Sequence, residues 1–199
     1  YAAGDILLSI ETAIGSSFND IIVGSNSAET LNGMDGDDTI SGNIGDDVIN
    51  GGNGNDTLSG GVGADIIDGG AGTDALSYST STAGVTVYLD GVTLGTGGDA
   101  AGDRVSNVET LTGSSFNDIL YGTAGAQSIF GGVGNDILDG GAGGDALDGG
   151  TGTDSVSFLT SGSGITASFA SGSLVITGTD ATGDSYVSIE GVIGSNFAD

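Results

Sequence analysis

The chain of 199 residues contains no cysteine, histidine, proline or tryptophan. The absence of cysteine excludes a disulfide framework and any thiolate metal site. Without histidine there is no imidazole base, so a Ser-His-Asp triad and a histidine-based zinc site are excluded as well. Carboxylates, hydroxyls and the backbone are therefore the groups left to carry any chemistry.

Basic residues are almost absent too. Lys and Arg together number 1 against 27 Asp and Glu, which gives a net charge of −26. The single cation, Arg104, cannot supply the basic footprint that nucleic-acid binding requires, nor attraction to an anionic membrane surface. No apolar run approaches the ~18 residues of a membrane span. We therefore expect neither nucleic acid nor membrane insertion, and the composition gives no sign of an enzyme.

Such acidity is typical of disorder, but the apolar content favours a folded chain. Hydrophobic residues make up 37% of the sequence and charged residues only 14%. A chain that can bury apolar surface while carrying uncompensated carboxylates is destabilised by self-repulsion unless a counter-ion is present. The composition thus indicates a bound cation.

Glycine, with 42 copies, recurs in a fixed register. Nonapeptide blocks begin at Gly15 and follow one another through Ser77, and a second array begins at Gly113 and runs through Ser157. Well-formed blocks read G-G-N-G-N-D-T-L-S (51–59) and G-G-V-G-N-D-I-L-D (131–139). The eighth position is aliphatic in all twelve blocks. The sixth position is acidic in eleven blocks, with Gln127 as the exception: Asp20, Glu29, Asp38, Asp47, Asp56, Asp65, Asp74, Asp118, Asp136, Asp145 and Asp154.

A longer period lies above the nonapeptide, because the segment 2–20 returns at 100–118 and again at 181–199. This pattern predicts the end of a spacer at 1–14, a seven-repeat array at 15–77, spacer strands at 78–112, a five-repeat array at 113–157, spacer strands at 158–193 and the start of a third array at 194–199. We interpret the chain as a section of a longer tandem protein. Neighbouring copies or other segments of the same repeat protein are its candidate partners.

The nine-residue unit predicts an all-β fold, because its glycines and its apolar period both disfavour a helix. We expect a parallel β-solenoid in which two units make one coil, with a six-residue turn and a three-residue strand in each unit. Glycines at the first and fourth positions would supply positive φ and allow close approach of the coils. The eighth-position side chains would form two opposed stacks, Ile22–Ile40–Leu58–Leu76 and Leu31–Ile49–Ile67.

That core is thin, since one aliphatic side chain contributes roughly 1.5–3 kcal/mol while each of nine residues costs about 1–2 kcal/mol of backbone entropy. Stacking also brings like charges together. A hard divalent cation between stacked turns, bound by carboxylates and turn carbonyls, would remove both deficits. An all-oxygen set of six to eight ligands favours Ca²⁺ over Mg²⁺, so we predict several calcium ions.

The motif G-G-x-G-x-D-x-U-x of blocks 51–59 and 60–68 resembles the RTX (hemolysin-type) calcium-binding nonapeptide. The resemblance implies a right-handed parallel β-roll in an exported bacterial protein that folds when it meets calcium outside the cell. It also implies that turn carbonyls and sixth-position aspartates bind the metal. The metal-site residues predicted in this way are Asp20, Asp38, Asp47, Asp56, Asp65, Asp74, Asp118, Asp136, Asp145, Asp154, Gly33, Gly36, Gly42, Gly45, Gly51, Gly54, Gly60, Gly63, Gly131 and Gly134.

Two functions fit this sequence. The first is a non-enzymatic, calcium-stiffened segment of a secreted or cell-surface protein of the adhesin, surface-layer or filament type. The second is an accessory calcium-binding module of a secreted polysaccharide-acting enzyme or another exported protein of this kind. Flanking sequence would separate them, because many tandem units favour the first and a catalytic domain favours the second.

Some residues depart from the repeat. Phe18, Phe116 and Phe197 stand where the motif has its second turn glycine, and we expect them to plug the start of each array. The spacer carboxylates Asp99 and Asp103, matched by Asp180 and Asp184, either hold an additional cation or belong to a solvated polar loop. The fifth-position acids Asp37 and Asp46 are expected to point outward, as surface charge.

Overall fold

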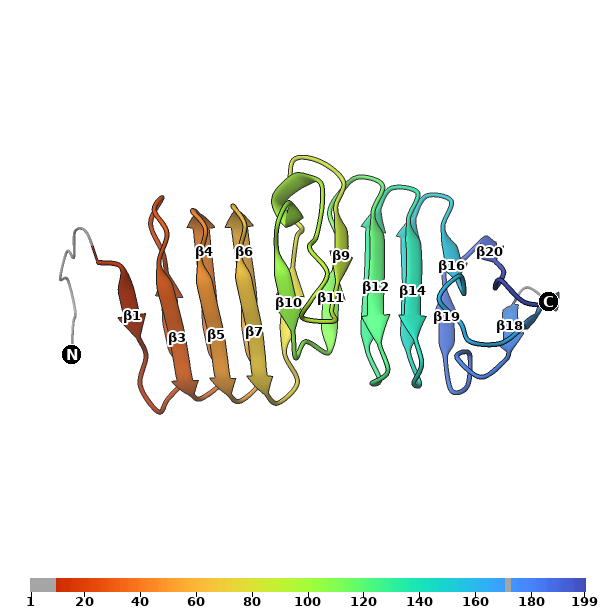
Figure 1. Cartoon of the computed structure of the whole chain (residues 1–199), viewed down its shortest axis with the longest axis horizontal. Coiled ribbons are helices and arrows are strands. Elements are labelled where there is room, and N and C mark those ends of the chain that lie inside the picture. The colour runs from red at the N-terminus through yellow and green to blue at the C-terminus, as the bar shows by residue number, and fades with distance from the viewer. Residues whose placement is uncertain (1–9, 171–172) are drawn as a thin grey trace.

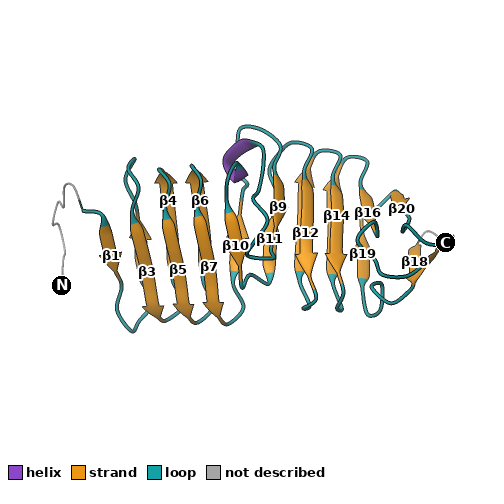
Figure 2. Cartoon of the chain, in the orientation of Figure 1, coloured by secondary structure: helices purple, strands orange, loops and turns teal. Residues whose placement is uncertain are grey.

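The computed structural model describes residues 10–170 and 173–199, which form an elongated parallel β-solenoid (Figure 1). Strands joined by short turns make up nearly all of it (Figure 2). In array 15–77 and before it, the strands are β1 (Thr12–Ile14), β2 (Ile21–Val23), β3 (Thr30–Asp35), β4 (Thr39–Ile44), β5 (Val48–Asn53), β6 (Thr57–Val62), β7 (Ile66–Ala71) and β8 (Ala75–Ser77). Residues 1–9 of the predicted spacer end at 1–14 lie outside the described residues.

The first spacer and the second array add one short 3₁₀ helix and eight strands. These elements are β9 (Thr86–Tyr88), η1 (Gly98–Ala100), β10 (Arg104–Ser106), β11 (Thr110–Thr112), β12 (Ile119–Thr123), β13 (Ser128–Val133), β14 (Ile137–Gly141), β15 (Ala146–Thr151) and β16 (Ser155–Ser157). The last four strands are β17 (Thr166–Ala170), β18 (Ser173–Thr177), β19 (Ser185–Val187) and β20 (Gly191–Ile193). Among the residues described, no helix is long and apolar enough to cross a membrane.

Each coil contains two nonapeptides, as predicted, because every strand pairs in parallel with the strand two units away. Ile40 is opposite Leu58, and Leu31 is opposite Ile49. One face is an unbroken sheet in the order β2-β4-β6-β8-β11-β13-β15-β19. The other face comprises β1-β3-β5-β7-β10 followed by β9-β12-β14-β16-β20.

The core consists of the predicted aliphatic stacks between the two faces. Leu31, Ile40, Ile49, Leu58, Ile67 and Leu76 are each at most 1% exposed, as are Leu120, Ile129, Leu138, Leu147 and Val156 in the second array. The prediction of two opposed stacks is therefore confirmed, apart from Ile22, which is only partly buried in the outermost described coil.

Most array strands are six residues long, twice the predicted length. In β4 the pairing continues past the eighth position into the next block, where Asn43 is opposite Gly61 and Ile44 is opposite Val62. The first three residues of each block thus prolong the strand instead of opening the turn. The turn shrinks to the residues immediately before the acid.

The first spacer continues the solenoid without a break. Within it, β10 stacks on β7, and β11 lies between β8 and β13. β9 precedes β10 in the sequence but pairs with β12, one step further along the axis. One face therefore holds two strands between β7 and β12, while the other holds one between β8 and β13. The loop carrying η1 protrudes from the side at this point (Figure 1).

The second spacer repeats this arrangement in part. β19 stacks on β15 and β20 on β16, so a further coil is added. β17 and β18 form an antiparallel hairpin beside them. Both spacers are thus coils of the same solenoid that carry an insertion.

Candidate metal sites

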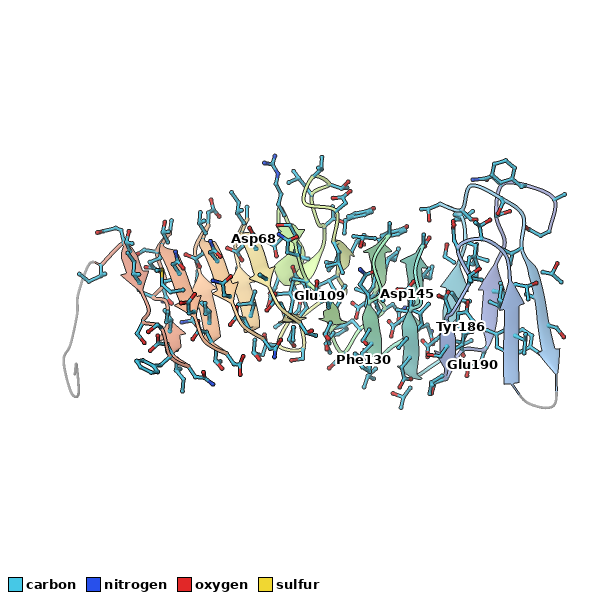
Figure 3. The ribbon with its side chains drawn as sticks, turned by 90° about the horizontal axis from the view of Figure 1, so that it is seen from below. Asp68, Glu109, Phe130, Asp145, Tyr186 and Glu190 are labelled. Atoms are coloured by element: carbon cyan, nitrogen blue, oxygen red, sulfur yellow. The ribbon has the colours of Figure 1, made fainter. Side chains whose placement is uncertain are left out.

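The sixth-position acids point into the solenoid, because alternate residues of an extended chain face the same side and the eighth position faces the core. Asp38, for example, comes two residues before Ile40, and each is 1% exposed. Asp145, marked in Figure 3 among the side chains seen from below, is also 1% exposed. A row of carboxylates therefore runs along each edge of the aliphatic stacks.

In most blocks, one oxygen of the sixth-position carboxylate links two coils. The Oδ1 atom of Asp38 accepts a hydrogen bond from the backbone N–H of Asp20, one coil earlier, at 2.7 Å. The same bond recurs through both arrays from Glu29 to Asp47, Asp38 to Asp56, Asp47 to Asp65, Asp56 to Asp74, Asp118 to Asp136, Gln127 to Asp145 and Asp136 to Asp154. Because these bonds use backbone donors, they hold the coils in register whatever side chain the donor residue carries.

The other oxygen is left without a partner in most blocks. Among the described residues, the Oδ2 atoms of eight aspartates are buried and accept no hydrogen bond: Asp38, Asp47, Asp56, Asp65, Asp74, Asp136, Asp145 and Asp154. An unpaired buried charge is costly and is normally neutralised or bound to a metal. These eight atoms are therefore the strongest candidates for cation ligands in the described residues.

The first-position glycine leaves space beside each of these oxygens. A Cβ at Gly33 would collide with the Asp38 carboxylate and with the carbonyl oxygen of Gly51, one coil later. Gly42, Gly51 and Gly131 have the same kind of surroundings. We call this space, bounded by the first-position glycine, the carboxylate and the carbonyl, the cradle. Two oxygen atoms of different coils converge on it.

Positive φ occurs at the second and fourth positions, not at the first and fourth as predicted. In block 51–59 these residues are Gly52, with φ 111°, and Gly54, with φ 134°. A Cβ at Gly54 would also meet the carbonyl oxygen of Gly36. The first-position glycine is needed because a Cβ would not fit there. The fourth-position glycine is needed for the same reason and also because of its positive φ. Met34 and Asn43 adopt positive φ at the second position without being glycine.

The electrostatics of the cradles favour a cation. Burial raises the pKa of Asp65 to about 7, with the like charges of Asp103 and Asp47 adding to it. Burial likewise raises the pKa of Asp136 and of Asp145 to about 6. With one Lys or Arg in the whole chain, basic side chains cannot compensate these charges.

The donor set fits Ca²⁺, provided that the backbone takes part. Nowhere in the described ranges do three acidic side chains come together as a metal site. A cation here would therefore combine carboxylates with carbonyls such as that of Gly51. Oxygen-only sets of this kind are what Ca²⁺ accepts in flexible geometry.

We call the series of inward-facing acids that accept an N–H from the preceding coil the ladder. Asp103 and Asp184 also belong to this ladder, which the sequence analysis did not predict. The Oδ1 atom of Asp103 accepts the N–H of Asp65 at 2.8 Å, and that of Asp184 accepts the N–H of Asp145 at 2.9 Å. Asp103 is 1% exposed, so a solvated loop is wrong for this residue. The available signal was the tail D-x-U-x in D-R-V-S (103–106), which lacks the glycine turn before it.

The two glutamates that follow complete the ladder. Glu109 accepts the N–H of Asp74 at 2.8 Å, and Glu190 accepts the N–H of Asp154 at 2.9 Å. Both are labelled in Figure 3. Each spacer therefore offers two carboxylates to the last two acids of the array before it.

The fifth-position acids are exposed, as predicted, but they too connect coils. Asp37 accepts the N–H of Asn55, and Asp46 accepts the N–H of Ala64, one coil later in each case. These bonds run in the opposite direction to those of the sixth-position acids. The fifth position thus forms an outer ladder in contact with solvent.

The phenylalanines at the start of each array are not plugs. Phe18, Phe116 and Phe197 are 76%, 46% and 56% exposed. They stand in the turn at the fourth position, where the side chain faces solvent instead of the core. The prediction of a hydrophobic plug is therefore wrong.

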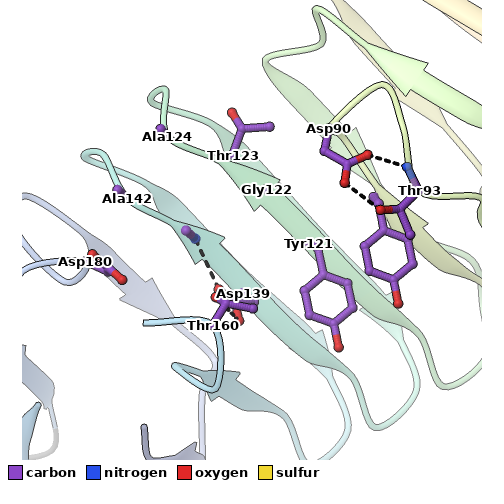
Figure 4. Close-up of a pocket in the computed structure, with 12 residues that line it drawn as sticks. Asp90, Thr93, Tyr121, Gly122, Thr123, Ala124, Asp139, Ala142, Thr160 and Asp180 are labelled. Carbon is purple, nitrogen blue, oxygen red and sulfur yellow. Dashed lines mark hydrogen bonds between the residues drawn. The ribbon is translucent and has the colours of Figure 1, made fainter. Parts of the chain in front are cut away.

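A groove of about 580 Å³ lies on the outside of the second array (Figure 4). Its floor carries Tyr88 and Tyr121, whose rings stack at 4.6 Å because β9 pairs with β12. Asp139 lies next in this column and accepts hydrogen bonds from Thr160 of the second spacer. Asp90 of the first spacer accepts bonds from Thr93. The groove is thus bounded by both spacers and is separate from the inward-facing ladder.

Comparison with known proteins gave one family. The model described as RTX calcium-binding nonapeptide repeat (4 copies) matches residues 9–40, 23–58, 41–76, 106–138 and 121–156. These matches cover more than half of the chain and include both arrays. No curated protein matches the chain.

Proposed function

Because the chain belongs to the RTX calcium-binding nonapeptide repeat family, we propose that it is a structural segment of a secreted or cell-surface protein that folds and stiffens when it binds several Ca²⁺ ions. The orphaned Oδ2 atoms of the sixth-position aspartates carry this proposal. They are buried, anionic and placed next to backbone carbonyls, and the chain has almost no basic residues of its own.

The residues that would hold the ions are the eight aspartates with orphaned oxygens and the first-position glycines that supply carbonyls. Calcium would contribute positive charge between stacked turns. The Oδ1 atoms keep the coils in register by accepting backbone N–H groups, and the glycines keep the cradles open. The aliphatic stacks exclude water from the inner side of the carboxylates.

A role in extending a larger protein is supported by the continuity of the solenoid. One face is an eight-stranded sheet that passes through the first spacer without interruption. At the strand spacing of about 4.8 Å, seven intervals span roughly 34 Å. A rod of this kind adds reach and stiffness to a surface protein without requiring a reaction.

Circular dichroism during titration with Ca²⁺, followed by excess chelator, tests the proposal. We expect β-sheet signal to appear with calcium and to be lost with chelator, and Mg²⁺ at the same concentration to be far less effective. A chain that is fully β-sheet in chelator and does not respond to calcium would overturn the proposal. Secretion is tested by locating the parent protein in culture medium, surface and cell fractions.

A further inference from the structure

The turns of the two arrays, together with turn 194–199 after the second spacer, are of two kinds. In the first kind, which we call open, the second and fourth residues have positive φ and the acid has an orphaned Oδ2. The open turns are 33–38, 42–47, 51–56, 60–65, 69–74, 131–136, 140–145 and 149–154. In the second kind, which we call closed, neither the second nor the fourth residue has positive φ. The closed turns are 15–20, 24–29, 113–118, 122–127 and 194–199.

A hydroxyl residue at the second position fills each closed turn. In turn 113–118, the backbone N–H of Ser114 donates to Asp118 Oδ2 at 2.6 Å, and its hydroxyl donates to Oδ1 at 2.7 Å. The hydroxyl oxygen in turn accepts the N–H of Phe116 at 3.1 Å. In turn 15–20, the N–H and the hydroxyl of Ser16 both donate to Asp20 Oδ2, and the hydroxyl oxygen accepts the N–H of Phe18. The donor to Oδ2 thus comes from the turn itself, while Asp118 Oδ1 also accepts the N–H of Val85 from the first spacer at 2.8 Å.

The rest of the cradle is the same in both kinds of turn. A Cβ at Gly113 would meet Asp118 Oδ2 and the carbonyl oxygen of Gly131, just as at Gly33 it would meet Asp38 Oδ2 and the carbonyl of Gly51. The two kinds of turn differ at the second and fourth residues, which have positive φ only in the open turn, and in the closed turn the N–H of the second residue donates to the carboxylate. Serine therefore stands where the open turn leaves an oxygen unpaired.

The type of residue at the sixth position also differs between open and closed turns. All eight open turns carry Asp at the sixth position, whereas the closed turns include Glu29 and the uncharged Gln127. Gln127 is held by the same partners, since its Oε1 accepts the N–H of Thr123 and its Nε2 donates to the Thr123 hydroxyl. Gln127 thus carries no charge that a cation would have to balance, and both ends of its amide already have partners.

Hydroxyl groups also donate hydrogen bonds to the spacer aspartates. Tyr78 donates to Asp103 Oδ2 at 2.8 Å, and Tyr186 donates to Asp184 Oδ2 at 2.9 Å. The tyrosines come from different places, because Tyr78 lies 25 residues before its partner and Tyr186 two residues after. The same bond is thus made by two unrelated routes, which indicates that this oxygen needs a donor.

The sixth-position residues and the spacer acids accordingly form four hydrogen-bonded runs along the solenoid. The runs are Asp20–Asp38–Asp56–Asp74–Glu109, Glu29–Asp47–Asp65–Asp103, Asp118–Asp136–Asp154–Glu190 and Gln127–Asp145–Asp184. Every run begins in a closed turn and ends at a spacer acid. All eight orphaned oxygens lie between these ends.

We propose that calcium binds only at the open turns, at most eight ions in this chain, and that hydroxyl groups close the first turns of each array and the spacer aspartates against the metal. The proposal rests on the calcium-binding function above and narrows it. It leaves Asp20 and Asp118, which the sequence prediction included, without a metal in their own cradles.

Calcium counting by equilibrium dialysis against ⁴⁵Ca²⁺ tests this. We expect no more than eight ions for the 199-residue chain, an unchanged number for Asp118→Asn and at least one ion fewer for Asp136→Asn. The double variant Ser114→Gly/Phe116→Gly converts G-S-S-F-N-D into the open pattern G-G-S-G-N-D, and we expect it to gain one ion. Phe116→Gly alone keeps the hydroxyl and should gain none.

Circular dichroism in saturating calcium verifies that each variant is folded before its ions are counted. If the unsubstituted 199-residue chain binds no calcium, the proposed function itself fails. If the unsubstituted chain binds calcium, two results would still show that the assignment of closed turns is wrong. They are the loss of an ion in Asp118→Asn and the absence of a gained ion in a folded double variant, and either would leave the calcium function standing. Should the double variant not fold, the comparison of Asp118→Asn with Asp136→Asn decides alone.

Discussion

Replacing Asp56 by Asn separates the two consequences of an orphaned carboxylate. Asn keeps the shape of the side chain and an oxygen that can accept the Asp38 N–H, which Asp56 Oδ1 now accepts at 2.8 Å. It removes the negative charge and the unpaired Oδ2 from the cradle beside Gly51. The change should therefore weaken calcium binding without breaking the link between coils.

Whether Asp56→Asn destabilises or stabilises the folded state depends on the presence of calcium. When free calcium is 100 times the dissociation constant, one bound ion stabilises the folded state by about 2.7 kcal/mol, and this is lost with the site. For a chain of this size that corresponds to a melting temperature lower by roughly 5–11 °C. In chelator the effect reverses, because burial raises the pKa of Asp56 and so opposes its charged form in the folded state. There the variant should be at least as structured as the parent.

Thermal unfolding followed by circular dichroism, in excess calcium and in chelator, measures both effects. Asp37→Asn is the matched control, since it removes the same charge from an exposed side chain that is bonded to the Asn55 N–H. We expect the control to change the melting temperature in calcium by less than 2 °C, as a surface substitution of about 0.5 kcal/mol or less would do. The reasoning fails if the control destabilises as much as Asp56→Asn, or if Asp56→Asn has no effect in calcium.

Three further outcomes follow from the geometry. Gly54→Ala places a Cβ against a carbonyl at φ 134° and should lower the melting temperature in calcium by several degrees, whereas Gly162→Ala, with nothing within 4 Å, should not. Tyr78→Phe leaves Asp103 Oδ2 without a donor and should cost about 1–3 kcal/mol by chemical unfolding, while Tyr88→Phe on the outer groove should cost far less. In chelator, acidification from about pH 8 to about pH 5 should increase β-sheet signal, because folded-state pKa values raised by burial to about 6–7 mean that the folded chain takes up protons in this window. A signal that falls on acidification in chelator would contradict that account.

The core could be predicted from the sequence because it follows from a local period. A nine-residue repeat with one aliphatic position fixes which side chains share a stack, and Ile40, Leu58 and Leu76 lie as expected. Positive φ at the second position was not predictable from composition, since Met34 and Asn43 adopt it as Gly52 does. The pattern of residue types shows where the turns are, but not which way their N–H groups point.

Contacts that depend on chain order were out of reach. β9 pairs with β12 although β10 and β11 lie between them in the sequence. This pairing brings Tyr88 and Tyr121 together. Asp103 lacks the glycine turn that marks other ladder members, and its partner Tyr78 lies on the far side of an insertion. No period connects such residues, so only the folded arrangement reveals them.

The closed ends explain how the two arrays can differ in length. The first array has seven blocks and the second five, yet each begins with two closed turns and is followed by a spacer that supplies an aspartate bonded to tyrosine and a glutamate. The difference is confined to the open turns, five in one array and three in the other. Adding or removing one coil therefore changes the number of orphaned oxygens by two without altering either end. A buried row of carboxylates must stop somewhere without leaving an unpaired charge, and hydroxyl donors provide such an end at the first turns of both arrays and at Asp103 and Asp184. If calcium binds only at the open turns, as proposed above, array length and calcium content vary together while the hydroxyl-bonded first turns stay the same.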